Sequence, residues 1–295
     1  MIEACAGHFG GMDKTLLSLG HGYSARALAT RLIPQGWRII GTTRSPDKLA
    51  KIAATGVEPM LWPGDDLTQL LQEVPNLLVS AGPGPEGDPV LLALQDEIAA
   101  AAPHLRWVGY LSTTGVYGDH GGDWVDETTP LAPSTRRGAA RVQAEAAWAA
   151  IPDLPLHIFR LAGIYGPGRG PFAKVRKGTA RRIIKEGQVF SRIHVEDIAQ
   201  ALELSLATPQ PGAVYNLCDD DPAPPQDVIG HAAELLGLPL PPAVDFNEAE
   251  MTPMARSFYA ESKKVRNDHA KAALGWQPIY PDYRSGLAAL LRSED

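Results

Sequence analysis

The sequence predicts an α/β fold built on a doubly wound parallel sheet, with a smaller α/β lobe beside it. Short apolar segments suited to buried strands alternate along the chain with longer segments that carry one apolar helical face. A glycine-rich turn joins the first strand-like segment to the first helix-like segment. The 295 residues, of which 44% are hydrophobic, suffice for one large domain or for two lobes.

The chain opens with a strand, a turn, a helix and a second strand. Residues 15–19 predict a buried strand, residues 25–32 predict a helix with one apolar face, and residues 37–43 predict the next strand. The turn between the first two reads Gly20-His21-Gly22-Tyr23-Ser24-Ala25. This is a G-x-G-x-x-A pattern in the context that a Rossmann-type dinucleotide site requires.

Each residue of this turn has a physical reason to be there. Gly20 allows the tight turn, Gly22 lets the backbone approach a pyrophosphate at the positive end of the helix, and Ala25 keeps the helix close to the strand. Tyr23 and Ser24 begin the helix beside the same group. The alternative is a strand–helix turn that uses glycine for geometry alone. The surrounding pattern favours cofactor binding.

The end of the second strand bears on which cofactor binds. An NAD site usually places Asp or Glu about 20 residues beyond the glycines. This chain has Thr43, Arg44 and Ser45 there, with Lys48 nearby. A guanidinium in place of a carboxylate suits the 2′-phosphate of NADP. We therefore predict NADP, with NAD as the alternative; the alternative for Arg44 is a solvated loop residue.

Three more strand-like segments extend the predicted sheet, at residues 56–62, 76–80 and 108–111. Asp66 follows the first of them and is predicted either to meet the adenine edge of the cofactor or to cap a helix. The second ends in small residues that let the backbone lie along a dinucleotide, namely Ser80, Ala81 and Gly82. Ligands bind at the carboxyl ends of strands in such sheets, so these residues are candidate cofactor contacts.

Composition and charge exclude several classes of protein. The net charge of −7 argues against nucleic-acid binding, and no run of about 18 apolar residues suits a membrane span. Cys5 and Cys218 are too few for a disulfide framework, and no His or Cys pairs have the spacing of a metal site. Residues 1–11 carry no secretory signal, so we expect a cytoplasmic protein. They are predicted to be a disordered extension, or upstream sequence before a start at Met12.

Three blocks in the middle of the chain are more specific than the glycine turn. They are Ser-Thr-Thr-x-Val-Tyr-Gly at 112–118, Tyr-Gly-Pro-Gly-Arg at 165–169 and His-Val-x-Asp-Ile-Ala at 194–199. In this order they resemble the extended and atypical short-chain dehydrogenase/reductases, the NAD(P)-dependent epimerase/dehydratase group, over residues 14 to 290. The resemblance implies a redox step on a small molecule, mostly a nucleotide sugar in that group. It also implies that the third block is largely structural.

The resemblance further implies site residues. The family uses a Ser or Thr at the end of the fifth strand, which Thr113 matches, and a Tyr-x-x-x-Lys pair on the next helix. Counting back from Glu145 puts Arg137 at the Tyr position and Arg141 at the Lys position. Arginine does not release a proton near neutral pH, so Arg137 is not a general base. Arg141 can still hold ribose hydroxyls or a phosphate.

Three alternatives remain for the proton donor that the missing tyrosine would supply. Tyr117 or Tyr165, in loops at the carboxyl ends of strands, could act as the acid, although packing is the alternative that we favour for both. The third substitute is a solvent proton, with Arg137 stabilising the oxyanion. For Thr113, the alternative to a site role is a strand-end hydroxyl satisfied by the backbone.

The predicted division of the chain is a cofactor domain, residues 12–162 with 193–219, and a smaller substrate lobe, residues 163–192 with 220–295. Six basic residues of that lobe suit an anionic substrate, with solvated surface charges as the alternative. They are Lys174, Arg176, Lys177, Arg181, Arg182 and Lys185.

These observations predict an NADP(H)-binding oxidoreductase or epimerase that acts on a small, anionic substrate with a hydroxyl or carbonyl group. The competing hypothesis is an inactive NADP(H)-binding regulator or scaffold, because Arg137 and Arg141 replace the usual catalytic pair. A weaker one is the binding of another nucleotide. Alanine-rich helices predicted at 90–102 and 138–150 are suited to packing against a second copy, which predicts a homodimer.

Overall fold

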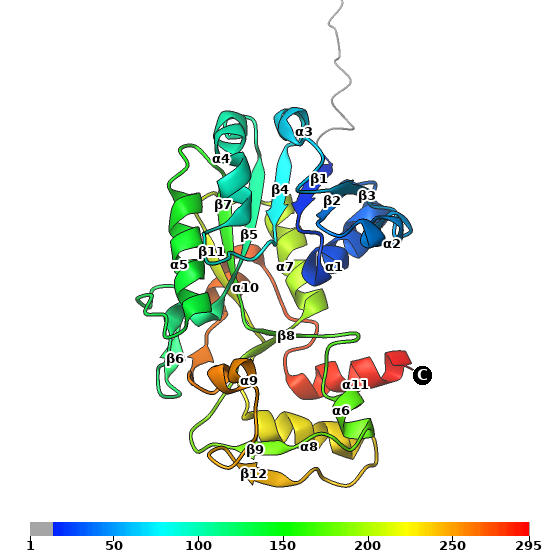
Figure 1. Cartoon of the computed structure of the whole chain (residues 1–295), viewed down its shortest axis with the longest axis vertical. Coiled ribbons are helices and arrows are strands. Elements are labelled where there is room, and N and C mark those ends of the chain that lie inside the picture. Colours follow the sequence, from blue (N-terminus) through cyan, green and yellow to red (C-terminus); the bar gives the residue numbers. More distant parts are fainter. Residues whose placement is uncertain (1–13, 295) are drawn as a thin grey trace, which may run out of the picture.

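A seven-stranded parallel sheet forms the centre of the computed structural model, which describes residues 14–294 (Figure 1). The strand order is β11-β7-β5-β4-β1-β2-β3. The strands are β1 (Thr15–Leu19), β2 (Arg38–Thr43), β3 (Glu58–Leu61), β4 (Asn76–Val79), β5 (Trp107–Thr113), β7 (Leu156–Leu161) and β11 (Val214–Leu217). The predicted doubly wound parallel sheet is confirmed. The predicted extension at residues 1–11 lies outside the described residues.

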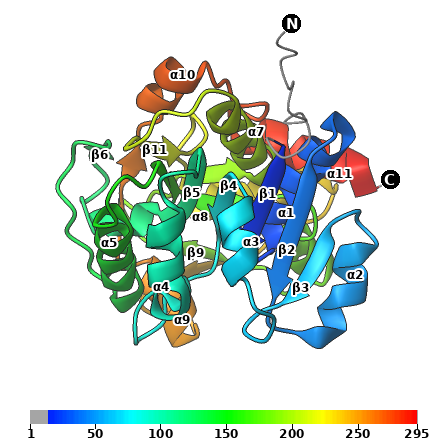
Figure 2. The same ribbon diagram turned by 90° about the horizontal axis from the view of Figure 1, so that it is seen from above.

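Helices cover both faces of this sheet, because neighbouring strand residues point to opposite faces. Leu16 belongs to one apolar core and Leu17 to the other. Figure 2 shows one set of helices, α3, α4 and α5, on one face, and α7 and α10 on the other. The helices are α1 (Tyr23–Leu32), α2 (Leu49–Ala53), α3 (Thr68–Glu73), α4 (Pro89–Ala101), α5 (Arg136–Ala149), α7 (Val195–Ala207) and α10 (Asp268–Leu274).

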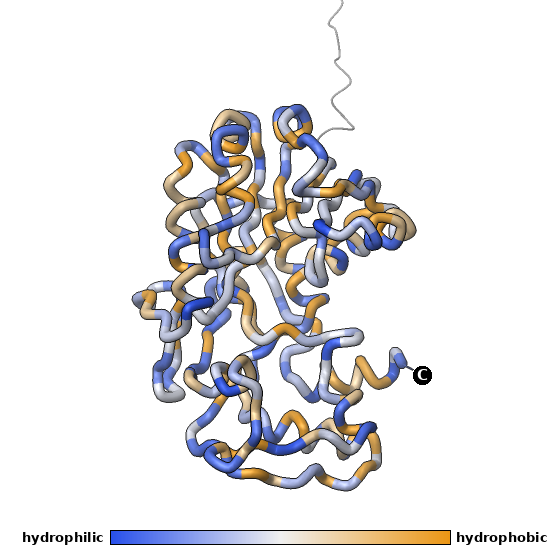
Figure 3. The backbone as a smooth tube through the Cα atoms, viewed as in Figure 1, coloured by the Kyte–Doolittle hydropathy of each residue, from blue (hydrophilic) through white to orange (hydrophobic). Residues whose placement is uncertain are grey.

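The helices owe their orientation to amphipathic sequences. In Figure 3 hydrophobic and hydrophilic residues alternate along the helices that flank the sheet, as expected for helices with one buried face. In α1, Leu28 and Leu32 are buried against the sheet, whereas Arg26 is exposed. Within the described residues, no helix has both the length and the apolar composition needed to cross a lipid bilayer.

The strand order reverses direction between β1 and β4. Strand β1 pairs with β2 on one side and with β4 on the other, and Leu19 is opposite Val79 in the register. The carbonyl oxygen of Leu19 accepts hydrogen bonds from the backbone amides of Ser80 at 3.0 Å and Ala81 at 3.2 Å. The carboxyl ends of β1 and β4 therefore meet at the point where open α/β sheets bind ligands.

A group of elements beyond this carboxyl edge, here called the small lobe, has its own apolar core. Phe172, Val228 and Leu287 are buried within it, and Figure 1 shows the group below the sheet. Its elements are α6 (Phe172–Arg176), β9 (Arg182–Ile184), α8 (Pro225–Leu235), β12 (Ala243–Asp245), α9 (Pro253–Phe258) and α11 (Tyr283–Glu294), with β9 paired to β12.

Two further strand pairs join distant parts of the chain between the sheet and the small lobe. Strand β8 (Gly163–Tyr165) pairs with β10 (Arg192–His194), and β6 (Trp124–Val125) pairs with β13 (Lys264–Val265). Both pairs are parallel. They bring segments from both halves of the sequence next to the loops that follow β5 and β7.

The structure places residues 264–276 differently from the predicted division, which assigned them to the substrate lobe. Val265, Ala270 and Trp276 are buried in the core on the α7 side of the sheet. The Sγ of Cys218 contacts the carbonyl oxygen of Val265 at 3.1 Å, which ties this stretch to the end of β11. The chain thus returns to the sheet before it forms α11. The other predicted boundaries stay predictions.

Candidate active site

The glycine turn after β1 forms a cradle that no side chain fills. Gly20 has φ +85°, and a Cβ built on it would lie 2.9 Å from the backbone nitrogen of Ala81. Gly22 is the N-cap of α1 and provides no side-chain cap, and the first turn of α1 holds no acidic residue. Ser24 and Ala25 are buried and hold α1 against the sheet. The free amides at the start of α1 therefore fit a pyrophosphate group.

Strand β2 holds the other side of this turn. Thr42 receives a hydrogen bond from the Gly20 amide on Oγ1 at 2.8 Å and one from the His21 amide on its carbonyl oxygen, also at 2.8 Å. Arg44 follows and is exposed, and within residues 14–294 no hydrogen bond or ion pair engages its guanidinium. The Ser45 amide donates to Thr43 Oγ1 at 3.2 Å, which shapes the turn that presents Arg44.

Asp66 lies in the loop between β3 and α3. Its Oδ1 accepts a hydrogen bond from the Thr68 amide at 2.9 Å, and this bond is the main cause of the lowered pKa of Asp66. The N-cap of α3 is Leu67 and makes no side-chain cap, so Asp66 shapes the turn before the helix, and both interpretations that the sequence leaves open stay predictions.

The small residues after β4 form the floor beside the cradle. The Oγ of Ser80 donates to the carbonyl oxygen of Gly20. A Cβ built on Gly82 would lie 3.3 Å from one terminal nitrogen of Arg141, so the guanidinium lies directly against this loop. Ala81 packs against Gly20 as described above. The backbone of residues 80–82 is thus open toward the same space as the glycine turn.

Arg141 is held in place by β5. Its Nη1 donates to the hydroxyl of Tyr110 at 3.0 Å and to the carbonyl oxygen of Leu111 at 2.6 Å, and its guanidinium lies 5.5 Å from the centre of the Tyr110 ring. The other terminal nitrogen faces Gly82. A fixed cation at the Lys position of the resembled motif therefore lies between the ends of β4 and β5.

Thr113 ends β5 and faces the first turn of α5. Its Oγ1 accepts from the Gly115 amide at 3.1 Å, which leaves the hydroxyl proton able to donate. Gly138 allows α5 to approach this loop, because a Cβ there would lie 2.6 Å from the carbonyl oxygen of Gly115. The Oγ1 of Thr135 caps α5 by accepting from the Gly138 amide at 3.0 Å. The hydroxyl position and the turn that carries Arg137 are therefore adjacent.

Arg137 is exposed on that first turn. Its guanidinium carbon lies 5.9 Å from the centre of the Phe258 ring at the end of α9. In the described part of the chain, no carboxylate pairs with Arg137. The residue at the Tyr position of the resembled motif thus presents an uncompensated positive charge beside the small lobe.

Tyr117 is fully buried in a polar network on the core side of the β5 loop. Its hydroxyl donates to Asn216 Oδ1 at 2.7 Å and accepts from Nη1 of Arg160 at 2.9 Å, and burial raises its pKa. Arg160 in turn forms a buried ion pair with Glu145 at 2.8 Å, and Glu145 accepts from Ser112. This arrangement supports the packing interpretation of Tyr117.

Tyr165 is buried between the sheet and the small lobe. Its ring contacts His194 edge-on at 5.1 Å between centroids, and its hydroxyl packs against Gly286 of α11. Burial also raises the pKa of this tyrosine. The structure does not bring this hydroxyl into contact with Thr113 or Arg141, so the surroundings of Tyr165 too support packing.

The loop after β8 closes over the start of α1. The hydroxyl of Tyr23 donates to the carbonyl oxygen of Pro167 at 3.0 Å, and the guanidinium of Arg169 lies 5.8 Å from the Tyr23 ring.

His194 caps α7 through Nδ1, and Asp197 accepts from the Ile279 amide at 2.5 Å. These contacts give the block at residues 194–199 the structural role that the resemblance implies.

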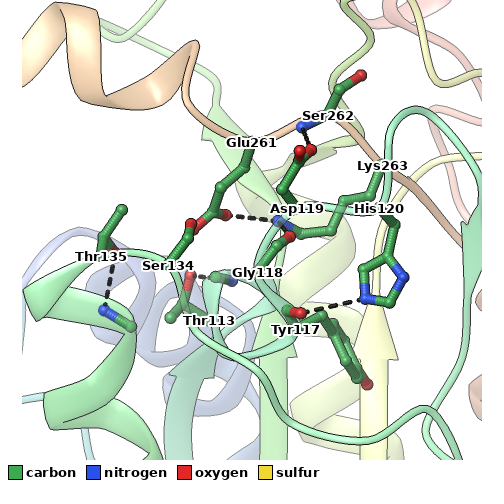
Figure 4. A network of polar contacts seen from close by, with 12 residues as sticks. Thr113, Tyr117, Gly118, Asp119, His120, Ser134, Thr135, Glu261, Ser262 and Lys263 are labelled. Atoms are coloured by element: carbon green, nitrogen blue, oxygen red, sulfur yellow. Dashed lines mark hydrogen bonds and ion pairs between the residues drawn. The ribbon is translucent and has the colours of Figure 1, made fainter.

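Three residues that the sequence did not single out for the site form a polar network at the loop that follows Thr113 (Figure 4). Glu261 accepts from Ser134 Oγ at 2.6 Å and forms an ion pair with Lys263 at 2.6 Å. Lys263, which is only 8% exposed, also donates to the carbonyl oxygen of Gly118 at 2.7 Å. We call Ser134, Glu261 and Lys263 the clasp. A basic Ser-Lys-Lys stretch was the only local signal for it, and nothing local pointed to its partners.

Four of the six residues of the predicted basic cluster have a polar partner, although Arg176 and Arg181 stay exposed. Arg176 pairs with Glu294 at 2.5 Å, and Lys185 donates to the carbonyl oxygen of Tyr259. Two more side chains donate to backbone carbonyl oxygens, Arg181 to Glu250 at 2.8 Å and Arg182 to Pro241 at 2.9 Å. Among the described residues, no group of three or more His, Cys, Asp or Glu side chains is arranged to hold a metal ion.

Three curated relatives share sequence with this chain, two of them protein YeeZ from different strains of Escherichia coli, whereas no protein-family model matches it. Protein YeeZ of Escherichia coli (strain K12) is 31% identical over 244 residues, which cover 77% of this chain and 86% of YeeZ. A 3-diazoavenalumate denitrifying reductase of a Streptomyces species is 30% identical over 177 residues, 56% of this chain and 55% of that protein.

Solved structures agree with the fold. A functionally unknown conserved protein from Silicibacter pomeroyi DSS is 66% identical, with a TM-score of 0.92 over 95% of this chain and 99% of that one. Human epimerase family protein SDR39U1 with NADPH has a TM-score of 0.74 over 94% of this chain and 99% of its own, at 19% identity. UDP-glucuronic acid 4-epimerase from Bacillus cereus in complex with NAD has a TM-score of 0.73 over 95% and 99%, at 17% identity.

The similarity to YeeZ extends over most of both chains, and the sheet order, the glycine turn and the β5 loop are arranged as the sequence blocks imply. The chain belongs to the same family as protein YeeZ, and it has the fold of the epimerase structures described above.

Proposed function

We propose that this protein is an NADP(H)-dependent oxidoreductase or epimerase that acts on a small, anionic substrate bearing a hydroxyl or carbonyl group. The observation that carries the proposal is the cradle at the ends of β1 and β4, with the fixed guanidinium of Arg141 against Gly82. Two structures of the same fold are described with a nicotinamide cofactor, one with NADPH and one with NAD. These neighbours support a nicotinamide cofactor here.

The residues present fit such a cofactor. The amides at the start of α1, those of Tyr23 and Ser24, would hold the pyrophosphate, since the Gly22 amide already donates to the Gly20 carbonyl oxygen at 2.7 Å. Arg44 and Ser45 would meet the 2′-phosphate that distinguishes NADP from NAD. Arg141 would hold the ribose next to the nicotinamide. A bound nicotinamide supplies the capacity to accept or give a hydride equivalent at a substrate carbon.

The chain's own residues would position and polarise the substrate. The Thr113 hydroxyl has a proton free to donate to a substrate oxygen. Arg137 would stabilise negative charge on that oxygen, because its guanidinium is a permanent cation with no carboxylate partner within residues 14–294. Arginine does not exchange a proton near neutral pH, so the proton comes from solvent in this mechanism.

A second candidate function is NADP(H) binding without catalysis, in a regulator or scaffold. The observation that favours it is the burial of both candidate tyrosines, Tyr117 in a polar network and Tyr165 against Gly286. In this case Arg137 and Arg141 would bind ligand only. The predicted cytoplasmic location stays a prediction beside either function.

Calorimetric titration of the purified protein with NADPH and with NADH is the first test. The proposal expects NADPH to bind, and to bind more tightly than NADH. The absence of binding by either cofactor would overturn both candidate functions. A substrate-dependent loss of NADPH absorbance would then exclude the scaffold, whereas cofactor binding without turnover of any carbonyl compound would favour it.

A further inference from the structure

Helix α9 of the small lobe presents an apolar face to the space beside α5. Met254 and Phe258 are 63% and 54% exposed, although both side chains are large and hydrophobic. They are four residues apart, so they lie on the same face of the helix. Exposed apolar residues that adjoin one another mark binding surfaces more often than isolated ones do.

The opposite side of α9 is firmly attached to the small lobe. Arg256 donates to the carbonyl oxygen of Ala249 at 2.8 Å, and its guanidinium lies 4.7 Å from the centre of the Phe246 ring. Arg256 is two residues from both Met254 and Phe258, so it points roughly the opposite way from the helix axis. The apolar face is thus held outward by a fixed helix.

Arg137 of α5 lies at the edge of this apolar face. Its guanidinium carbon is 5.9 Å from the centre of the Phe258 ring. Glu261 is the acidic residue that follows closely after Phe258 in the sequence, but its two carboxylate oxygens are engaged by Lys263 and Ser134. The carboxylate of Glu261 is therefore paired within the clasp, and the guanidinium of Arg137 remains available to a ligand.

The contacts of the basic cluster argue against a nucleotide sugar as that ligand. Four of its six side chains are occupied, by the carboxylate of Glu294 and by three backbone carbonyl oxygens. A nucleotide diphosphate is bound best by free guanidinium groups that reach both phosphates. Arg137 of α5, which has no carboxylate partner among the described residues, instead lies next to the Phe258 ring of the small lobe.

We propose that the substrate site takes a planar aromatic carboxylate, with its ring on Phe258 and Met254 and its carboxylate on Arg137. The guanidinium has five N–H donors in one plane, so it can pair with the carboxylate and still face the oxygen held by Thr113. This inference rests on the proposed function only for the place of the reacting carbonyl group.

Isothermal titration with three probes tests it: cinnamate, its neutral analogue cinnamamide, and UDP-glucose. The titrations use the full-length protein, with and without NADP. We expect cinnamate to bind, cinnamamide to bind about tenfold more weakly or worse, and UDP-glucose not to bind, because only cinnamate provides both the ring and the charge. Binding of UDP-glucose without binding of cinnamate would overturn the proposal.

Matched variants test the residues. Arg137→Gln should weaken cinnamate about tenfold or more, whereas Arg136→Gln, at the exposed neighbouring position of α5, should leave it unchanged. Phe258→Ala should weaken cinnamate and cinnamamide alike. Equal effects of the two arginine variants would overturn the assignment of the carboxylate to Arg137.

A separate NADPH titration of each protein keeps this inference distinct from the proposed function. NADPH binding without cinnamate binding overturns the inference and leaves the proposed function standing. Cinnamate binding without NADPH binding overturns the proposed function and leaves this inference standing. Exposed side chains are changed in every variant, so thermal denaturation should show that all of them fold.

Discussion

The ammonium group of Lys263 lies 2.6 Å from the carboxylate of Glu261, and the two side chains are only 10% and 12% exposed. A buried ion pair is costly to break, because the remaining charge is left without a partner in a poorly solvated place. Glu261 also accepts from Ser134, and Lys263 donates to the Gly118 carbonyl oxygen, so this pair links the small lobe to the loop that carries Thr113.

Lys263→Met should therefore lower the free energy of unfolding by about 3 kcal/mol, since Glu261 would stay buried and unpaired. Urea denaturation followed by circular dichroism measures this. The control is Lys264→Met, because that amine lies 5.4 Å from the Trp124 ring and forms no buried ion pair; it should cost under about 1 kcal/mol. Adding Glu261→Gln to Lys263→Met should restore part of the loss. A strictly additive double variant would contradict the coupling.

Gly20→Ala should impair both folding and cofactor binding. The new Cβ would meet the Ala81 backbone at 2.9 Å in addition to the cost of positive φ, about 1–2 kcal/mol. Gly36→Ala is the matched control, because Gly36 has φ +83° but nothing within 4 Å of a Cβ. Thermal denaturation and NADPH titration of both variants measure the difference. Equal NADPH affinities in the two would show that the approach of Gly20 to Ala81 does not shape the cradle.

Arg44→Asp should weaken NADPH about tenfold or more and NADH much less, because a carboxylate repels a 2′-phosphate and accepts from a ribose hydroxyl. Fluorescence titration with both cofactors gives the ratio of affinities. Lys48→Asp makes the same change of charge nearby and should alter that ratio less. Equal losses for both cofactors in the Arg44 variant would show that Arg44 does not meet the 2′-phosphate.

The contribution of Asp219 to stability should fall as the pH rises from about 4 to about 8. Asp219 is 1% exposed, and burial raises its pKa to about 8 despite the opposing effect of Arg192. An unfolded Asp has a pKa near 3.9, so between these values the folded state holds the proton more tightly. The stabilising contribution is complete below pH ~4 and is lost as the pH passes about 8.

Asp219→Asn should reduce this slope, so that the variant gains stability relative to the parent as the pH is raised. Urea denaturation at a series of pH values measures the slope. Asp96→Asn is the control, because Asp96 lies exposed on α4. A slope that is the same in the parent and in Asp219→Asn would rule out Asp219 as a source of the pH dependence.

The predicted homodimer has a defined candidate surface. Leu92 of α4 is 65% exposed beside a groove that α4 forms with Ala140 and Ala147 of α5. If a second copy packs there, Leu92→Glu should convert a dimer to a monomer, because it places a charge in an apolar contact. Sedimentation velocity gives the mass. Leu240→Glu, at a 53% exposed site in the small lobe, should leave it unchanged. A monomeric parent protein would contradict the homodimer prediction.

The part of the candidate site that the sequence predicts depends only on residues close together in the chain. Gly20, Gly22 and Arg44 occupy their places because each directly follows a strand whose apolar run is visible in the sequence, and the parallel sheet brings those strand ends together. Their positions need no knowledge of distant contacts. For this reason the fold class and the cradle could be predicted.

The clasp could not be predicted, because its chemistry depends on partners far away in the chain. Ser134 and Glu261 are separated by 127 residues, and neither stands in a pattern that marks a site. The same reason explains why residues 264–276 were assigned to the wrong side: Trp276 and Val265 are buried by contacts with β11 and α7 that no local periodicity encodes. The burial of Tyr165 against Gly286 is a further long-range packing effect.

The pairing of β6 with β13 and the bond from Lys263 to Gly118 determine the order in which parts of the candidate site can form during translation. The parts of the glycine cradle, from Gly20 to Arg141, are all present once the first half of the chain has been made. The Thr113 loop acquires its last support only when Lys263, 145 residues after Gly118, leaves the ribosome. A nascent or prematurely terminated chain can therefore contain every residue of the cradle and still lack the bond that supports the Thr113 loop.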